Sequence, residues 1–197
     1  MNLVERAKNM IVSPKTEWEA VASEDPNIQQ ILMGYVLPLA LIPTLATIIG
    51  WGAIGILGFT SFTYGIALGL VQLINAFLSV LIAGFVIDAL AGSFGSTKNM
   101  GRAVQLVAYS MTPIWVFGIL NIIPAIGWLS FLLGLYALFL IYLGLTPLMK
   151  TPEDKKAVYM IVSIVILGAV YWIISIILTS ILLAIFGLSL FGAMMSY

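Results

Sequence analysis

The sequence contains no cysteine and no histidine. Disulfides, thiol nucleophiles and Ser-His chemistry are therefore excluded, as are haem and zinc sites of the usual ligand types. Charge is equally scarce, because only 8% of the 197 residues are Asp, Glu, Lys or Arg. A soluble domain needs a surface of interspersed charges, and this chain does not have enough charged residues to build one.

The chain is instead rich in apolar residues, at 62% of the sequence, with a mean hydropathy of +1.15. This composition predicts an integral membrane protein whose first partner is the lipid bilayer. Eight basic and eight acidic residues cancel to a formal net charge of zero. Nucleic acid is not expected as a partner, because phosphate binding needs a basic excess. We predict no metal and no cofactor.

Five apolar segments are long enough to cross a bilayer. We expect helices over about 28–50, 64–90, 103–120, 128–145 and 152–186. The predicted fold class is an all-α integral membrane protein, a five-transmembrane-helix bundle preceded by short amphipathic interfacial helices. The predicted layout is a cytoplasmic amphipathic segment over 1–27, a five-span domain over 28–187 and an apolar extracytoplasmic tail over 188–197.

The N-terminal residues predict two short interfacial helices. Apolar residues recur at helical spacing in the first of them, at Leu3, Val4, Ala7, Met10 and Ile11. Ser13-Pro14 predicts the cap and first turn of the second helix, which would place Trp18 at headgroup depth. No apolar run follows the charges of the first helix, so we expect a retained segment and not a signal peptide.

Caps, prolines and glycines shape the predicted spans. Asp25-Pro26 predicts the start of the first span, and Thr151-Pro152 predicts the start of the fifth. Pro38 and Pro43 predict a kink in the first span. Glycines between 50 and 58 predict a break and a loop half-buried at the far membrane interface. Gly65-x-x-x-Gly69 permits both a homo-oligomer and ordinary packing within one chain.

The third span carries a stripe of polar residues. Arg102, Gln105, Tyr109 and Thr112 follow one another at i, i+3, i+7 and i+10, which places them on one helix face. Pro113 frees a backbone carbonyl near Tyr109. Asp88 lies just before the polar turn 92–101, across from Arg102. The candidate functional cluster is therefore Asp88, Arg102, Gln105, Tyr109 and Pro113.

Two interpretations of this cluster stay open. An ionisable residue within a span is a functional candidate by default, and these residues could line a vestibule. Alternatively, Asp88 and Arg102 form a structural ion pair near the interface that holds the hairpin shut. Gln72 and Asn75 form a second candidate pair inside the membrane, on a different helix face from Asp88, and interhelical hydrogen bonds are the ordinary use of such groups.

The hairpin of spans two and three resembles the Yip1 domain family. The resemblance lies in Ala91-Gly92-Ser-Phe-Gly-Ser, in Gly101-Arg102-Ala103 and in Ala108-Tyr109-Ser110-Met-Thr-Pro113, with Tyr142-Leu-Gly144-Leu further along. It implies a five-span layout with a cytosolic N-terminus. Eukaryotic relatives act in membrane traffic with Rab-type GTPases, but their Asp-Leu-Tyr-Gly-Pro element is absent here. The resemblance is therefore to a compact, bacterial-type member.

These features bear on three possible functions. The resemblance and the cytoplasmic N-terminal segment favour a non-enzymatic membrane organiser or adaptor that binds a protein partner at the cytoplasmic face. A transporter or channel for a small solute, ion or lipid, using the polar groups of spans two and three, is the alternative. An intramembrane enzyme is disfavoured, since an aspartyl dyad needs two acids at depth and only Asp88 comes near.

The distribution of basic residues predicts the orientation. All eight precede span one or lie between spans two and three or four and five. The positive-inside rule then places the N-terminus in the cytoplasm of a cell (inner or plasma) membrane and the C-terminus outside. A reporter fused after Tyr197 should be active only on the extracytoplasmic side. Activity confined to the cytoplasm would contradict this orientation.

Overall fold

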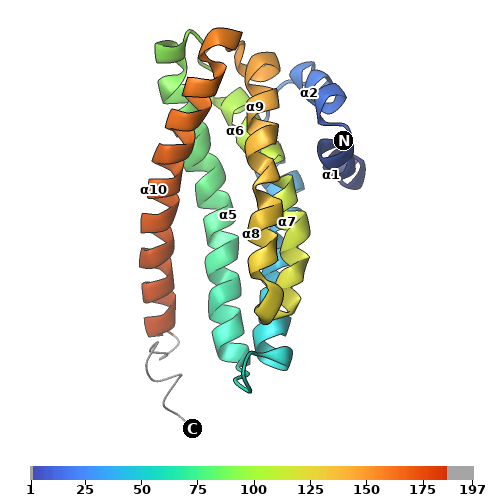
Figure 1. Ribbon diagram of the computed structural model, residues 1–197, viewed down its shortest axis with the longest axis vertical. Coiled ribbons are helices and arrows are strands. Elements are labelled where there is room, and N and C mark those ends of the chain that lie inside the picture. Colours follow the sequence, from blue (N-terminus) through green and yellow to red (C-terminus); the bar gives the residue numbers. More distant parts are fainter. Residues whose placement is uncertain (1, 186–197) are drawn as a thin grey trace.

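The computed structural model describes residues 2–185 and confirms an all-helical bundle with five spans (Figure 1). The spans run over Ile28–Ile54, Phe62–Phe94, Met100–Ile122, Pro124–Met149 and Glu153–Ile181. Two short helices, α1 (Leu3–Val12) and α2 (Pro14–Ala22), precede them and lie beside one end of the bundle. The expected tail 188–197 lies outside the described residues.

Most spans are built from consecutive helical pieces. The first consists of α3 (Ile28–Ile31), the π-helix η1 (Leu32–Val36), α4 (Leu37–Ile49) and the π-helix η2 (Gly50–Ile54). The second is α5 (Phe62–Ala91) with the 3₁₀ turn η3 (Gly92–Phe94). The third comprises α6 (Met100–Ser110), α7 (Thr112–Phe117) and the 3₁₀ turn η4 (Gly118–Ile122). The 3₁₀ turn η5 (Pro124–Ile126), α8 (Trp128–Gly134) and α9 (Tyr136–Met149) form the fourth, and α10 (Glu153–Ile185) forms the fifth.

Proline explains where the first and third spans change their helical form. Pro38 has no N–H, and the chain before it relaxes into η1, where the Leu37 N–H donates to the Leu32 carbonyl five residues back. Pro113 likewise cannot bond the Tyr109 carbonyl, and the Thr112 hydroxyl donates to that oxygen at 2.6 Å. The carbonyl expected near Tyr109 is thus satisfied by a side chain, at the point where α6 gives way to α7.

The long helix α5 lies in the middle of the bundle, in contact with α4, α6 and α10 (Figure 1). Glycine makes the approach of α4 possible, because a Cβ on Gly65 would lie 2.9 Å from the Ile48 carbonyl oxygen. A Cβ on Gly69 would lie 2.8 Å from the Ile48 side chain. The small-residue motif therefore packs two helices of the same chain together.

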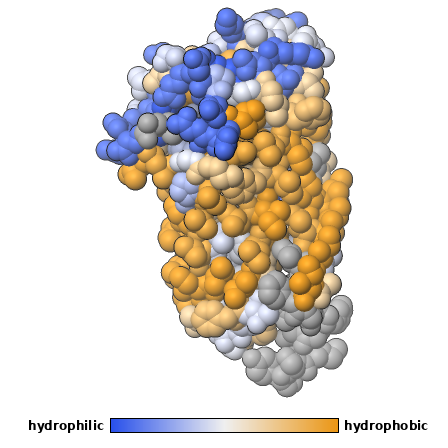
Figure 2. All heavy atoms as spheres, turned by 180° about the vertical axis from the view of Figure 1, so that it is seen from behind, coloured by the Kyte–Doolittle hydropathy of each residue, from blue (hydrophilic) through white to orange (hydrophobic). Residues whose placement is uncertain are grey.

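The turn segments 92–99 and 150–152 meet at the end of the bundle that carries α1 and α2. The Thr97 N–H donates to the Met149 carbonyl at 2.8 Å, and the Ser96 hydroxyl donates to Thr151 Oγ1 at 2.9 Å. The eight basic residues lie on these segments, on the first turns of α6 and α10, or on α1 and α2. Figure 2 shows the result as a hydrophilic cap on an apolar body. We call this end the polar end.

At the opposite end, the break in the first span comes later than expected. The span continues through η2 to Ile54, and a tight hairpin with a bridge between Ile56 and Phe59 then leads to α5. Leu57 at the tip has a φ of 51° and is fully exposed, although the stretch was expected to be half-buried. Edge-to-face contacts among Trp51, Phe59 and Tyr64 support the base of the hairpin.

The helix caps differ in part from the expected ones. Asn27, and not Asp25, caps the first span by accepting the Gln30 N–H at 3.0 Å. Ser13 occupies the cap position of α2 without a side-chain hydrogen bond, while Pro14 begins the helix as expected. The Thr151 hydroxyl donates to the Leu145 carbonyl at 3.2 Å, so it fastens the end of α9.

Glycine substitutions should separate tight from open helix faces. A Cβ at Gly65 meets backbone atoms of α4, whereas a Cβ at Gly168 on α10 meets nothing within 4 Å. Gly65→Val should therefore destabilise the protein by roughly 1–3 kcal/mol through overpacking. Gly168→Val is the matched control and should leave stability unchanged. Thermal unfolding in detergent would measure both, and equal stability of the two variants would contradict this packing.

Candidate functional site

Some apolar residues of α1 pack against the bundle, and others are exposed. Asn2 caps the helix by accepting the Val4 N–H at 3.1 Å, and Ala7 and Met10 are buried. Val4 and Val12 are 73% and 71% exposed. The predicted amphipathic helix is therefore present, but only part of its apolar face is left to meet a membrane or a partner.

The guanidinium of Arg6 is the unexpected centre of the contact between α1 and α2. Arg6 is only 6% exposed, and its Nε lies 2.9 Å from Glu17 Oε1 while its Nη2 pairs with Glu24. Asn9 Nδ2 donates to the other Glu17 oxygen at 2.9 Å. A buried guanidinium needs such charged partners, because moving it out of water without a partner would cost several kcal/mol.

Arg102 attaches the end of α2 to the start of α6. Its two terminal nitrogens donate to the Val21 and Ala22 carbonyls, each at 3.0 Å. These are carbonyls of the last turn of α2, where a cation is favoured by the helix dipole. Arg102 Nη1 also donates to Gln105 Oε1 at 3.1 Å. Arg102 therefore donates hydrogen bonds both to α2 and to a residue of its own helix, α6.

The Tyr109 side chain on α6 contacts residues of α1, α2 and the first span. The Arg6 guanidinium lies over its ring at 5.3 Å, and the Trp18 and Tyr35 rings lie at 6.4 Å and 4.7 Å. The Tyr35 and Thr112 hydroxyl oxygens are 2.6 Å apart. Because Thr112 gives its only proton to the Tyr109 carbonyl, Tyr35 is the donor in this bond.

These contacts define the N-terminal docking interface, made by Arg6, Glu17, Trp18, Glu24, Tyr35, Arg102 and Tyr109. The polar stripe of the third span faces this interface, since Gln105 bonds Arg102 and Thr112 bonds Tyr35, and Gln105, Tyr109 and Thr112 are each 3% exposed or less. Its side chains hold other helices and do not line an open vestibule.

Asp88 is not part of this interface. The expected ion pair with Arg102 is absent from the residues that the structure describes, since Arg102 binds the carbonyls of α2. Asp88 is half-buried in the last turn of α5, and its Oδ1 is buried without a hydrogen-bond partner. The structure thus separates the two charges that the sequence had suggested as a pair.

Gln72 and Asn75 are also separated, because each bonds to a different span. Gln72 Oε1 accepts the Thr47 hydroxyl of α4 at 3.0 Å, and Asn75 Nδ2 donates to the Ser175 hydroxyl of α10 at 3.1 Å. Both are the interhelical hydrogen bonds that polar groups in hydrocarbon ordinarily make. They tie α5 to its two neighbours.

Comparison with known proteins agrees with this architecture, since the model of the Yip1 domain matches residues 8–175. The chain belongs to the Yip1 domain family. No curated protein and no solved structure matches it. The match begins within α1, so it includes most of the N-terminal docking interface as well as the spans.

Small residues of the Yip1 resemblance lie at this interface. A Cβ on Gly144 would lie 2.8 Å from Trp18 Cε2, and a Cβ on Gly101 would lie 2.9 Å from Pro26. Trp18 is 1% exposed, so its ring packs inside the protein, and its placement at headgroup depth stays a prediction. The absence of a side chain at position 144 gives the indole its place against α9.

Sequence reasoning missed Arg6, Glu17, Glu24 and Tyr35 of the interface. The helical spacing could have indicated the burial of Arg6, because Arg6 precedes Met10 by four residues and so lies on the same face of α1 as this buried residue. The positions of Glu24 and Tyr35 gave no comparable signal, since their partners lie in other helices.

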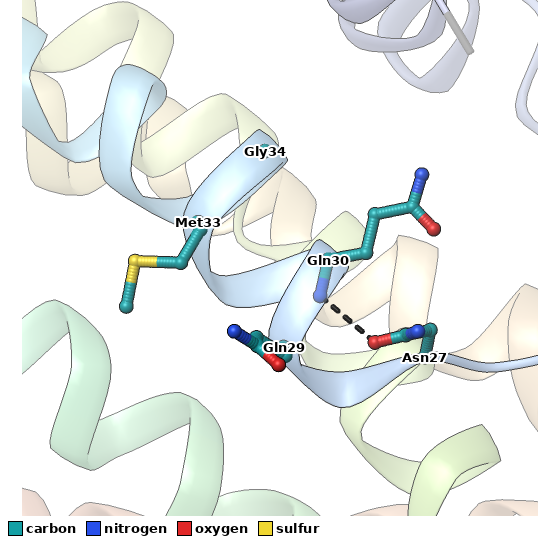
Figure 3. Close-up of a pocket in the computed structure, with 5 residues that line it drawn as sticks. All are labelled: Asn27, Gln29, Gln30, Met33 and Gly34. Carbon is teal, nitrogen blue, oxygen red and sulfur yellow. Dashed lines mark hydrogen bonds between the residues drawn. The ribbon is translucent and has the colours of Figure 1, made fainter.

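A shallow, open pocket of ≈ 490 Å³ lies at the start of the first span, lined by Asn27, Gln29, Gln30, Met33 and Gly34 (Figure 3). Asn27 is occupied as the helix cap, while the Gln30 and Met33 side chains point away from each other. Because the pocket contains none of the predicted site residues, the docking interface is the better candidate in this Yip1 domain.

Removing the Arg6 guanidinium should release the N-terminal helices. In Arg6→Ala, Glu17 would stay buried without its partner, at a cost of about 3 kcal/mol in docking. The chain has no native cysteine, so Met10→Cys reports directly on release by its reaction with a maleimide. Labelling at position 10 should accelerate about a hundredfold. Lys8→Ala, on the exposed side of α1, is the control, and equal labelling in both would contradict the interface.

Proposed function

We propose that this Yip1 domain protein is a non-enzymatic membrane organiser or partner-binding adaptor. The polar end would lie in the cytoplasm, with the chain in the inner or plasma membrane. The proposal rests on one observation above all: Arg102 and Tyr109 of the polar stripe hold α1 and α2 against the third span.

The geometry of the stripe argues for a scaffold. A pathway for a solute needs polar groups that can exchange partners with a passing molecule. Here Gln105 and Thr112 are bonded within the protein and nearly inaccessible, while Tyr109 is covered by Arg6 and two aromatic rings. The same commitment argues against catalysis, because these groups already hold structural contacts.

The docked helices offer a surface to a protein partner at the polar end. Val4 and Val12 are exposed on α1, next to the exposed charges of Glu5, Lys8 and Lys15. Apolar side chains ringed by charges are typical of a binding surface for a protein. We infer that docking fixes the position of this surface relative to the spans, so a partner would recognise α1 and the bundle together.

Site-specific photocrosslinking in native membranes tests this proposal. A photoreactive residue at Val12 should yield a discrete protein adduct, and Arg6→Ala should reduce that adduct because α1 is no longer held in place. A probe at Ile161, exposed on the apolar surface of α10, is the control and should label mainly lipid. An adduct of twice the chain's mass would identify a homo-oligomer as the partner. Failure to recover any protein at Val12 would count against the adaptor.

Transport of a small solute, ion or lipid is the second candidate, and one observation favours it. The buried Oδ1 of Asp88 has no hydrogen-bond partner in the described chain, as a group awaiting a ligand would. Liposome flux separates the candidates: a transporter should lose flux in Asp88→Asn, whereas an adaptor should show none above protein-free vesicles in either form.

A further inference from the structure

Asp88 occupies a position that disfavours a carboxylate in three ways. It lies in the last turn of α5, where the helix dipole repels an anion. It is half-buried, and its Oδ1 is fully enclosed without a donor. It also has no ion-pair partner among the residues described. An ionisable residue with these surroundings in a membrane span is a candidate for binding.

The Tyr159 hydroxyl does not hydrogen-bond Asp88. Tyr159 on α10 lies within electrostatic range of the carboxylate and is fully buried. Its hydroxyl, however, donates its one proton to the Ile87 carbonyl, and its ring stacks on Phe94 at 4.8 Å. Tyr159 therefore holds the end of α5 against α10 and leaves the carboxylate to an external donor.

Two lysines converge on the turn that follows Asp88. Gly92 lies one helical turn beyond Asp88 on the same side of the chain, and the Lys98 Cε lies 3.5 Å from where a Cβ of Gly92 would be. Lys155 Nζ lies 3.7 Å from the corresponding position of Gly95. Both lysines are exposed and take part in none of the ion pairs formed by the described residues.

Asp88 and the turn that follows it lie at the edge of the apolar surface. Phe85, one turn before Asp88, is 63% exposed on a membrane span, so its ring faces hydrocarbon. Ser93 and Lys98 just after Asp88 are exposed on the polar end. The boundary between the two is the depth at which lipid headgroups lie.

We propose that the end of α5 and the turn Gly92–Gly95 bind the headgroup of a phospholipid that carries a primary ammonium group. Asp88 would accept hydrogen bonds from the ammonium, while Lys98 and Lys155 would pair with the phosphate. The ligand matches the site in charge, because one carboxylate and two lysines meet one cation and one anion joined by a short linker. This site is separate from the N-terminal docking interface and does not rest on the proposed adaptor function.

The choice of headgroup follows from the chemistry of Asp88. The quaternary ammonium of phosphatidylcholine has no N–H to donate, so it cannot hydrogen-bond the Asp88 carboxylate, of which only Oδ1 is enclosed. Phosphatidylglycerol offers the phosphate but no cation, and Asp88 would repel it. Phosphatidylethanolamine supplies both groups, and it is the probe we choose.

Photoactivatable lipids with identical acyl chains test the site in the full-length protein. The protein would be reconstituted in phosphatidylcholine vesicles with a trace of photoactivatable phosphatidylethanolamine, phosphatidylcholine or phosphatidylglycerol. The ethanolamine lipid should label the segment around Phe85–Lys98 about tenfold more than the choline lipid, as one charge-assisted hydrogen bond would give. Asp88→Asn should remove this preference, whereas Lys98→Gln and Lys155→Gln should lower labelling by both phosphatidylethanolamine and phosphatidylglycerol.

Two further variants make the result decisive. Asp154→Asn removes an exposed acid at the same end and should keep the preference. Asp88→Glu restores the carboxylate and should retain it in part, so a preference lost in Asp88→Asn but kept in Asp88→Glu cannot come from misfolding. If Asp88→Asn folds and still prefers the ethanolamine lipid, or if the choline lipid labels the segment equally in the unaltered protein, the proposal is overturned.

Discussion

The burial of the Arg6 guanidinium is the interaction on which the polar end depends. Withdrawing a charge from water is tolerated only when it is paired and hydrogen-bonded, and Arg6 finds Glu17, Glu24 and the Tyr109 ring. These groups come from α2, from the segment after it and from α6. Satisfying one cation therefore requires the N-terminal helices to lie against the third span.

The same requirement organises the spans themselves, because a polar group in hydrocarbon needs a partner from the protein. Gln72 and Asn75 join α5 to α4 and α10 through single hydrogen bonds, and the hydroxyls of Tyr35 and Thr112 join the first span to the third. Asp88 differs from these four side chains, because its Oδ1 is buried without a hydrogen bond and it forms no ion pair among the described residues. A carboxylate without an ion pair, followed by a turn that two lysines approach, is the place in this Yip1 domain where we expect an outside molecule to contribute most.

Local sequence features predicted much of this architecture. The lengths of the apolar runs predicted five spans, and the structure has five. The spacing of Arg102, Gln105, Tyr109 and Thr112 predicted a polar stripe, and these residues face the N-terminal docking interface. The first turn of the first span was harder, because Asp25 and Asn27 are both capping residues and only the backbone geometry distinguishes them.

The sequence by itself determined that the chain crosses a membrane, how often, and that its cations gather at one end, because hydropathy, helix length and charge are properties of consecutive residues. Only the tertiary structure decided which charges meet. Arg102 reaches the carbonyls of α2 instead of Asp88, and Trp18 enters the space beside Gly144, because helix rotation and depth arise from packing between segments far apart in the chain. Local sequence patterns do not predict these contacts between distant segments.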